Sequence, residues 1–466
     1  MQRIHAFGDD ALGELDAVGL ADAIRAEWVS RTDVVEAAIS RTEAVNPALN
    51  GLAHEAFQRA RATASRGVGR GFFGGVPTYI KDNIDVAGLP TMCGTDAWAP
   101  YGAVADSEFT QLYLATGPVC LGKTQLSEFG FSASAEHPRL GPVRNPWNTD
   151  YTAGASSSGS AAFVAAGVVP IAHANDGGGS IRIPASCNGL VGLKPSRGRL
   201  PLDPEYRRLP VGIVANGVLT RSVRDTAAFY REAERMWLNP KLPPVGDVMR
   251  PGKQRLRIAV VTRSILRDCS PELRELTLKT AGLLEELGHR VEQVDTWVPT
   301  SFVDDFVMYW GFLALAQVSI GRRRFGKTFD RTRLDNFTLG LARHTRRNMH
   351  RLPTAIARLR TLRRRSAQFF GTHDVLLTPT LADPTPPVGY LAPTDYDRLL
   401  ERLTSWVAFT PLQNVTGEPA ISLPLTQSAN GLPVGMMLAA DVGGEARLLE
   451  LAYELEEARP WARIQD

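Results

Sequence analysis

Residues 154–194 read GASSSGSAAFVAAGVVPIAHANDGGGSIRIPASCNGLVGLK, in which clusters of glycine and serine alternate with short apolar runs. The runs Val168–Ala172 and Val191–Leu193 have the length and composition of buried strands. The apolar segment Ala161–Ala166 indicates a buried helix just before the first of them. Strands that alternate with helices in this way predict an α/β fold around a mixed or parallel sheet.

Outside this stretch the same pattern continues. Further strands are predicted at 76–80, 119–121, 257–261, 290–294, 375–379 and 420–424. Helices are predicted near the N-terminus, at 272–287, across 302–370 and at 446–458. A segment rich in proline and glycine at 239–252 indicates a long loop or linker between the two halves of the pattern.

The composition is that of a soluble globular protein, with 466 residues, 44% hydrophobic and 22% charged. A net charge of +3 gives no reason to expect a nucleic-acid or membrane partner. The first residues lack the pattern of a signal peptide, and the best apolar run, 161–172, is too short to span a bilayer. The four cysteines have no metal-ligand spacing, so we expect reduced thiols and a cytoplasmic protein.

Arginines are concentrated between residues 322 and 365. They allow two interpretations, an RNA-binding surface or amphipathic helices with a solvated basic face. Leucine and phenylalanine recur among them at helical spacing, and no aromatic stacking motif accompanies them. The amphipathic helices are the favoured interpretation.

A lysine ends the first apolar strand of the central region, in Gly74–Asn83. Burial at such a place lowers the pKa of an amine and favours the neutral form, which can accept a proton. Pairing of Lys81 with Asp82 or another carboxylate is the alternative, and this segment alone does not decide between them.

The serines of the segment Gly154–Ser160 allow a flexible loop or a helix start whose hydroxyls are held in place. The glycines of the next segment, Asn175–Pro184, let backbone N–H groups turn toward a ligand. Such donors suit a phosphate or a developing oxyanion beside Ser180, and the known phosphate-loop patterns are not present.

Together these segments resemble the amidase signature family. Its glycine-serine region ends in D-x-G-G-S-I-R-x-P, which residues 176–184 follow, and its lysine segment G-V-P-x-x-I-K-D matches residues 75–82. The similarity extends to residues 145–147, 192–195 and 432–435, and it is greatest to actinobacterial members, particularly those of mycobacteria. The chain is therefore identified as a member of this family.

The resemblance implies one compact domain over residues 1–466, an α/β/α sandwich around a large mixed β-sheet. Within it we expect a helical N-terminal part at 1–70 and a catalytic core at 71–235. A variable helical region at 300–370 and the C-terminal strands and helix would complete the same fold.

The resemblance also implies that the protein hydrolyses small or medium carboxamides through an acyl-enzyme. Ser180 would be the nucleophile, Lys81 the base, and Ser156 the bridging serine that the family holds in a cis peptide. The family's spacing selects Ser156 over Ser157 as the bridging residue. No metal or organic cofactor is expected.

Further site residues follow from the same resemblance. The backbone N–H groups of Gly177, Gly178 and Gly179, together with that of Ser180, are expected to bind the oxyanion. The family usually has threonine or isoleucine at the position of Gly177 and glycine at that of Ser158. Both differences are expected to alter loop rigidity and pocket shape.

Supporting and substrate-binding residues can also be assigned. Ser157, Asp176 and Arg182 are expected to support the loops, and contact of Arg182 with an acidic substrate is the alternative. The expected pocket residues are Phe129, Gly130, Phe131 and Ser132, with Tyr309 and Trp310 from the variable region. We expect a largely apolar acyl or amine group to suit this pocket.

Other functions are weighed against this one. The Asp-Gly-Gly-Gly-Ser segment is similar to that of 6-aminohexanoate cyclic dimer hydrolases, and a partner-dependent tRNA amidotransferase subunit is a further alternative. His173 lies in an apolar strand and is expected to be a core residue, and Cys187 lacks the companions of a thiol nucleophile. The expected ligand is a small amide, and the expected assembly a single chain or a homodimer.

Overall fold

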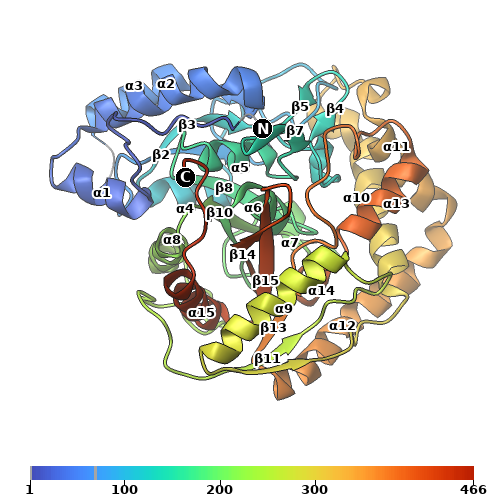
Figure 1. The fold of residues 1–466 in the computed structure, drawn as a ribbon. Helices are drawn as coiled ribbons and strands as arrows, with labels where there is room; N and C mark the ends of the chain where they lie inside the picture. Colours follow the sequence, from blue (N-terminus) through green and yellow to red (C-terminus); the bar gives the residue numbers. More distant parts are fainter. Residues whose placement is uncertain (1–2, 68–70) are drawn as a thin grey trace.

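A large mixed β-sheet forms the middle of the molecule (Figure 1). The computed structural model describes residues 3–67 and 71–466. The strands are β8 (Ile171–Asp176), β9 (Val191–Lys194), β10 (Ala215–Thr220), β11 (Arg257–Val260), β12 (Arg290–Gln293), β13 (Val375–Pro379), β14 (Ala420–Gln427) and β15 (Pro433–Ala439). Their order is β12-β11-β13-β15-β14-β9-β10-β8, with β11 parallel to β12 and β13 and the other neighbours antiparallel. The predicted α/β fold around a mixed sheet is confirmed.

A three-stranded sheet adjoins β8 at the edge of the large sheet. It consists of β1 (Leu52–Glu55), β3 (Val119–Thr124) and β2 (Pro77–Lys81), in that order. β2 lies beside β8, where Thr78 Oγ1 donates to the Ile171 carbonyl at 2.9 Å. Two short hairpins lie farther along the chain, β4 (Glu136–His137) with β5 (Gly141–Pro142) and β6 (Arg144–Asn145) with β7 (Asn148–Thr152). The end of β2 is thereby brought next to the end of β8.

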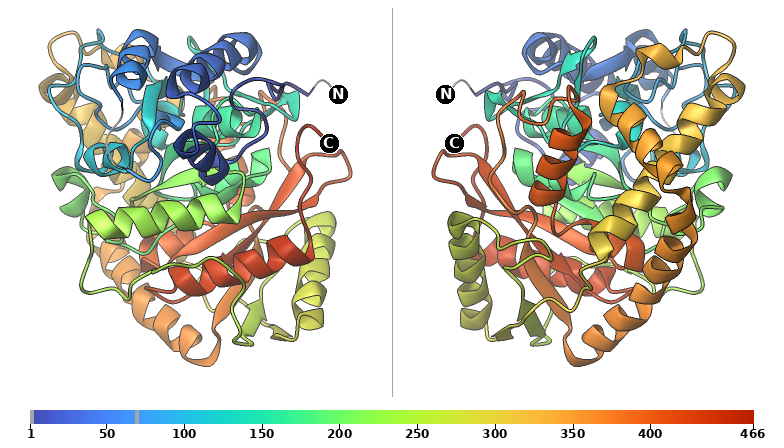
Figure 2. Two further views of the ribbon diagram at one scale, coloured as in Figure 1. Left: turned by 90° about the vertical axis from the view of Figure 1, so that its left-hand side faces the viewer. Right: turned by 90° about the vertical axis from the view of Figure 1, so that its right-hand side faces the viewer.

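Helices pack on both sides of the sheet, as the two side views show (Figure 2). α8 (Val223–Met236) and α15 (Glu445–Ala458) lie together on one side, against β9, β10 and β14. α6 (Arg182–Asn188) packs on β9, β14 and β15, and α5 (Ser158–Ala165) packs on α6 and β8. Further helices are α4 (Glu108–Ala115), α7 (Pro204–Arg207) and α9 (Pro271–Glu286), with η1 (Glu128–Gly130).

The region predicted to be helical at 300–370 lies on the opposite side from α8 and α15 (Figure 2). It contains α10 (Phe302–Phe325), η2 (Arg331–Arg333), α11 (Asn336–Arg347), η3 (Met349–Arg351) and α12 (Leu352–Thr372), and α13 (Tyr396–Trp406) and α14 (Pro411–Thr416) follow. The apolar sides of these helices are buried, while Arg346, Arg347 and Arg364 are exposed, so the helices are amphipathic as predicted. α10 is long and apolar enough to span a membrane by length and composition, and its buried side packs on α11 and α12.

The N-terminal part differs from the prediction in one respect. It contains α1 (Ala17–Arg25), α2 (Arg31–Leu49) and α3 (Phe57–Arg66), and strand β1 lies between α2 and α3. β1 pairs antiparallel with β3, so the part expected to be helical at 1–70 also contributes to a sheet. Residues 1–2 and 68–70 of that range lie outside the described residues. The strand is only four residues long and half-buried, which explains why no apolar run marks it.

Gly192 lets α6 approach the sheet closely. A Cβ atom built on Gly192 would lie 2.6 Å from the Cβ of Ala185 in α6 and 3.1 Å from Ile181 Cγ2. Real carbon atoms do not pack at 2.6 Å, so a side chain at this position requires the helix to move away from the strand. The position of the Ser180 loop, which leads into α6, therefore depends on a glycine in β9.

We expect Gly192→Ala to destabilise the protein by about 1–3 kcal/mol, as overpacking of a filled core does. Gly282→Ala in α9 is the matched control, because a Cβ there meets no atom within 4 Å. Alanine raises helix propensity, so we expect this control to be neutral or slightly stabilising. Urea unfolding followed by circular dichroism measures both, and equal stability of the two variants would contradict the packing argument.

Candidate functional site

Ser180 lies on the loop that connects β8 to α6. Gly179 in this loop has φ of +132°, and a Cβ atom there would lie 2.3 Å from Thr410 Oγ1. Thr410 Oγ1 in turn donates to the Gly178 carbonyl at 2.7 Å. The glycine is therefore required both by its backbone conformation and by the close approach of residue 410.

A buried ion pair closes the base of this loop. Asp176 ends β8, Arg182 begins α6, and both side chains are fully buried. Arg182 Nε and Nη2 each donate to an Asp176 carboxylate oxygen at 3.0 Å. The carboxylate also accepts from the N–H groups of Gly179 and Ile181, at 2.7 and 3.1 Å. Burial by itself would raise the pKa of Asp176, but the nearby charges of Arg182 and Lys194 and the hydrogen bonds from Arg182 and Asn414 hold this pKa well below its usual range.

Helix α14 completes the ion pair from a distant part of the chain. Asn414 Nδ2 donates to Asp176 Oδ1 at 2.8 Å, and Asn414 Oδ1 accepts from Arg182 at 2.7 Å. Gln413 Oε1 accepts from the other Arg182 nitrogen at 3.0 Å. The guanidinium of Arg182 thus binds the two ends of the loop region and α14, and its donors are occupied within the protein. Gln413 and Asn414 could not be predicted from the sequence, since no local pattern links them to the loop.

Lys81 lies at the end of β2 with its amine among uncharged groups. Its Nζ atom is 2.7 Å from Ser156 Oγ, 2.7 Å from Asn175 Oδ1 and 3.4 Å from the Asn175 carbonyl oxygen. Complete burial lowers the pKa of Lys81 to about 7, with Asp176 partly opposing the shift. A substantial fraction of the amine is therefore neutral near pH 7.

The neighbouring carboxylate Asp82 pairs with a different lysine. Lys123 Nζ on β3 lies 3.0 Å from Asp82 Oδ1 and also donates to the Pro90 carbonyl at 3.0 Å. Both side chains of this pair are buried. The alternative in which Lys81 pairs with Asp82 is therefore wrong, because Asp82 turns toward the neighbouring strand.

The three consecutive serines have different partners. The peptide bond between Ala155 and Ser156 is cis, and the Ser156 hydroxyl faces Lys81. Ser157 Oγ donates to the Ser180 carbonyl at 2.5 Å, and Ser158 Oγ donates to the Gly154 carbonyl at 2.6 Å. Ser156 is thus the serine next to the lysine, and Ser157 ties the two loops together.

Two asparagines next to Lys81 were not found from the sequence. Asn175 immediately precedes Asp176, and its side chain exchanges hydrogen bonds with that of Asn83 at 3.0 and 3.1 Å. These bonds fix Asn175 Oδ1 as an acceptor toward Lys81. Both asparagines are close in the chain to residues that were predicted, since Asn83 follows Lys81 by two positions and Asn175 precedes Asp176. This proximity could have indicated them.

The expected oxyanion donors need one correction. The Gly179 N–H already donates to Asp176 Oδ1 at 2.7 Å, so it does not point to a ligand. Within residues 3–67 and 71–466, the N–H groups of Gly177, Gly178 and Ser180 donate no hydrogen bond to another residue. Three of the four predicted donors are therefore free, and the fourth, the Gly179 N–H, is bound to the Asp176 carboxylate.

Two side chains excluded as nucleophile or base are buried in the core. Lys81 N–H donates to His173 Nδ1 at 3.2 Å, and burial with the nearby Lys81 charge lowers the pKa of His173 to about 3. Burial raises the pKa of Cys187 to about 12. Near pH 7 the His173 imidazole is therefore a very weak base, and the Cys187 side chain remains a thiol and not the reactive thiolate.

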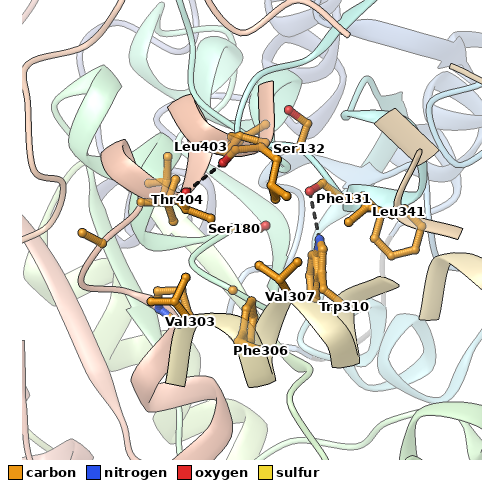
Figure 3. Close-up of a pocket in the computed structure, with 18 of the residues that line it drawn as sticks. Phe131, Ser132, Ser180, Val303, Phe306, Val307, Trp310, Leu341, Leu403 and Thr404 are labelled. Carbon is orange, nitrogen blue, oxygen red and sulfur yellow. Dashed lines mark hydrogen bonds between the residues drawn. The ribbon is translucent and has the colours of Figure 1, made fainter. Parts of the chain in front are cut away.

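A cavity of about 100 Å³, partly open to solvent, lies in front of Ser180 (Figure 3). Lys81 and Ser156 do not line it. Apolar side chains from α10, α11 and α13 form a large part of its wall, and charged side chains do not occur among the lining residues. The residues labelled around it include Phe131, Ser132, Val303, Phe306, Val307, Trp310, Leu341, Leu403 and Thr404.

The structure corrects two of the predicted pocket residues. Gly130, Phe131, Ser132 and Trp310 line the cavity, whereas Phe129 and Tyr309 do not. Phe129 packs against Trp98 and Phe325, at ring centroid distances of 6.0 and 5.8 Å. The Tyr309 side chain turns into the helical core, where its hydroxyl donates to the Val211 carbonyl at 2.8 Å. The sequence could not show which of two adjacent aromatic rings faces the cavity.

We expect Arg182→Met to cost about 3–5 kcal/mol of stability, because it leaves the buried Asp176 carboxylate without its counter-charge. Arg365→Met, at an exposed position of α12, is the matched control and should change stability little. Chemical denaturation measures both. Similar unfolding midpoints for the two variants would show that the pair does not hold the loop.

Comparisons with known proteins show the family of this chain. The family model described as Amidase matches residues 33–449. The protein named as amidase AmiC in Mycobacterium leprae is 79% identical over all of this chain and 99% of its own length.

Two solved structures are also similar. A 6-aminohexanoate cyclic dimer hydrolase complexed with substrate has a TM-score of 0.88 and 30% identity, over 98% of this chain and 99% of that one. A bacterial aryl acylamidase of the amidase signature family has a TM-score of 0.83 and 27% identity, over 96% and 97%. A buried lysine beside a cis-linked serine, under a glycine loop that carries a second serine, thus occurs in a chain that belongs to the amidase signature family.

Proposed function

We propose that this amidase hydrolyses uncharged carboxamides with Ser180 as nucleophile, Ser156 as proton relay and Lys81 as base. The observation that carries the proposal is the 2.7 Å contact between the buried Lys81 Nζ and Ser156 Oγ. A neutral amine has two N–H groups and one lone pair. Both acceptors of Asn175 receive the N–H groups, which leaves the lone pair for the Ser156 hydroxyl.

The first step forms a tetrahedral intermediate. Ser180 Oγ attacks the amide carbon while its proton passes to Ser156 Oγ, and the Ser156 proton passes to Lys81 Nζ. The carbonyl π electrons move to oxygen, and the N–H groups of Gly177, Gly178 and Ser180 are proposed to stabilise the resulting charge. Lys81 is then an ammonium ion, which its uncharged surroundings disfavour and which therefore returns the proton readily.

The second half of the reaction reverses this relay. The proton returns from Lys81 through Ser156 to the leaving nitrogen, the C–N bond breaks, and an ester of Ser180 remains. Water then attacks the ester with the same base assistance, which releases the carboxylic acid and restores the Ser180 hydroxyl. The water supplies both the oxygen of the acid and the proton returned to the serine.

The substrate proposed from the cavity is a small or medium amide with a largely apolar acyl or amine group. No charged side chain lines the described cavity, and burying an unpaired substrate charge there would be costly. Hydrolysis of cyclic or linear oligoamides is the second candidate, favoured by the likeness to the cyclic dimer hydrolase over nearly the whole chain.

We also propose that the chain acts alone in the cytoplasm, as a monomer or homodimer, rather than as an amidotransferase subunit. The support is that one chain supplies the base, both serines and the cavity wall. Turnover of a panel of neutral, acidic and cyclic amides by the purified chain would test this. Activity that appears only after partner subunits are added would favour the amidotransferase function.

A fluorophosphonate probe is expected to label the wild-type protein, and Ser180→Ala should abolish labelling because the attacking oxygen is lost. Ser65→Ala, an exposed position on α3, is the matched control and should label normally. Mass spectrometry of the labelled peptide identifies the site. Continued labelling of Ser180→Ala would assign the nucleophile elsewhere.

We expect kcat/KM to rise about tenfold per pH unit below pH 7 and to level off above it, because only neutral Lys81 accepts a proton and its pKa lies at about 7. Lys81→Met should lower kcat by at least about a thousandfold, since the relay acts as a unit. Lys279→Met, which removes an exposed lysine of α9, should leave the pH profile unchanged. A wild-type profile that is flat from pH 6 to 9 would contradict a titrating lysine base.

A further inference from the structure

Trp310 on α10 packs directly on the glycine loop. A Cβ atom built on Gly177 would lie 3.2 Å from Trp310 Cη2 and 3.4 Å from Cζ3. Few real Cβ contacts are as short as 3.2 Å, so the indole occupies the space that a side chain at position 177 would need. At Gly178 the corresponding Cβ would be 3.4 Å from Phe306 Cζ, an ordinary contact distance. The tight fit is thus specific to the pair of Gly177 and Trp310.

The same indole holds two other parts of the cavity. Trp310 Nε1 donates to the Phe131 carbonyl at 3.0 Å, and the two rings meet edge to face with centroids 5.5 Å apart. On its own helix the indole stacks on Phe306, with centroids 5.4 Å apart and an interplanar angle of 22°. Figure 3 shows Trp310 and Phe306 side by side below Ser180, with the indole turned toward Phe131.

We propose that Trp310 is a positioning and specificity-determining residue, which leaves little room for a side chain at position 177 and couples the nucleophile loop to the cavity wall. The inference rests on the proposed amide hydrolysis. Through Gly177 the ring limits the position of the oxyanion donors, and through Phe131 it sets the opposite wall of the cavity. The large indole fills space that a bulkier acyl or amine group would otherwise occupy.

The coupling predicts that two substitutions compensate each other. Gly177→Ala alone requires the loop or the indole to move by a few tenths of an ångström. A displacement of catalytic groups by a full ångström costs about a hundredfold, so we expect kcat to fall by about three- to tenfold. Trp310→Phe removes the outer ring atoms that would meet the new methyl group. The double variant Gly177→Ala/Trp310→Phe should therefore recover most of the loss in kcat caused by Gly177→Ala, instead of combining the two losses.

A substrate series gives a second measure of the same contact. Phenylalanine at 310 enlarges the cavity and removes the hydrogen bond to Phe131. We expect the ratio of kcat/KM for a bulky branched or aromatic amide over that for a small one to rise about tenfold, the usual scale for a change of pocket size. A general loss of folding would lower both values together and leave the ratio unchanged.

The experiment compares the wild type, both single variants and the double variant, with Gly282→Ala and Trp28→Phe as controls. Gly282 has open space around its Cβ position, and Trp28 is 82% exposed, so neither control should change turnover or preference. The rate of fluorophosphonate labelling and the thermal midpoint Tm are measured for every variant. We expect the double variant to have a higher Tm and faster labelling than Gly177→Ala.

The inference would be overturned if the two substitutions acted independently. In that case the fold-losses in kcat would multiply in the double variant and the changes in Tm would add. The size preference of Trp310→Phe would also be the same as that of the wild type. Failure of the proposed function has a different signature. In that case the wild type turns over none of the amides, while the Tm values of the four proteins still report whether residues 177 and 310 are coupled.

Discussion

The buried ion pair between Asp176 and Arg182 is the constraint on which the site depends. Its two residues stand at the ends of β8 and α6, so the loop between them has little freedom once both charges are in place. Every donor and acceptor of the pair must be satisfied, because an unpaired charge at this depth would be very costly. The loop N–H groups and Asn414 meet that requirement. The resulting loop geometry directs Ser180 toward the cavity.

The adjacent lysine depends on the opposite property, the lack of a counter-charge. Lys81 and Lys123 are both buried and lie on neighbouring strands. Lys123 has the Asp82 carboxylate at 3.0 Å, whereas Lys81 is surrounded by a serine and an asparagine. Burial without a partner favours the neutral amine, which is the form a base requires. The direction in which one aspartate turns therefore separates a structural lysine from the proposed catalytic one.

The side of the site that faces the substrate is made by a later part of the chain. α10, α11 and α13 bring apolar side chains over a loop that lies more than a hundred residues earlier. The two parts lie close together, since the indole of Trp310 lies 3.2 Å from where a Cβ atom of residue 177 would be and hydrogen-bonds to the Phe131 carbonyl. The proposed base and the apolar wall of the cavity consequently come from different parts of the chain, so a substitution in the wall can change the cavity without altering the surroundings of Lys81.

Local pattern and family resemblance were sufficient for much of this protein. Most strands of the large sheet, the amphipathic helices and the region of the lysine and serine segments could be predicted, because period, apolar runs and glycine placement are local properties. The buried strands β10 and β15 were not predicted. The short strand β1 was missed, since four half-buried residues leave no such pattern.

Only the tertiary structure decided which partners these residues meet. It turned Asp82 toward Lys123, used the Gly179 N–H to hold Asp176, and placed Trp310 rather than Tyr309 at the cavity. Each outcome depends on residues that are remote in the chain or on the direction of one side chain. The sequence by itself determined the residue types and their order, while packing between distant elements decided which amine lacks a counter-charge and which N–H groups are free.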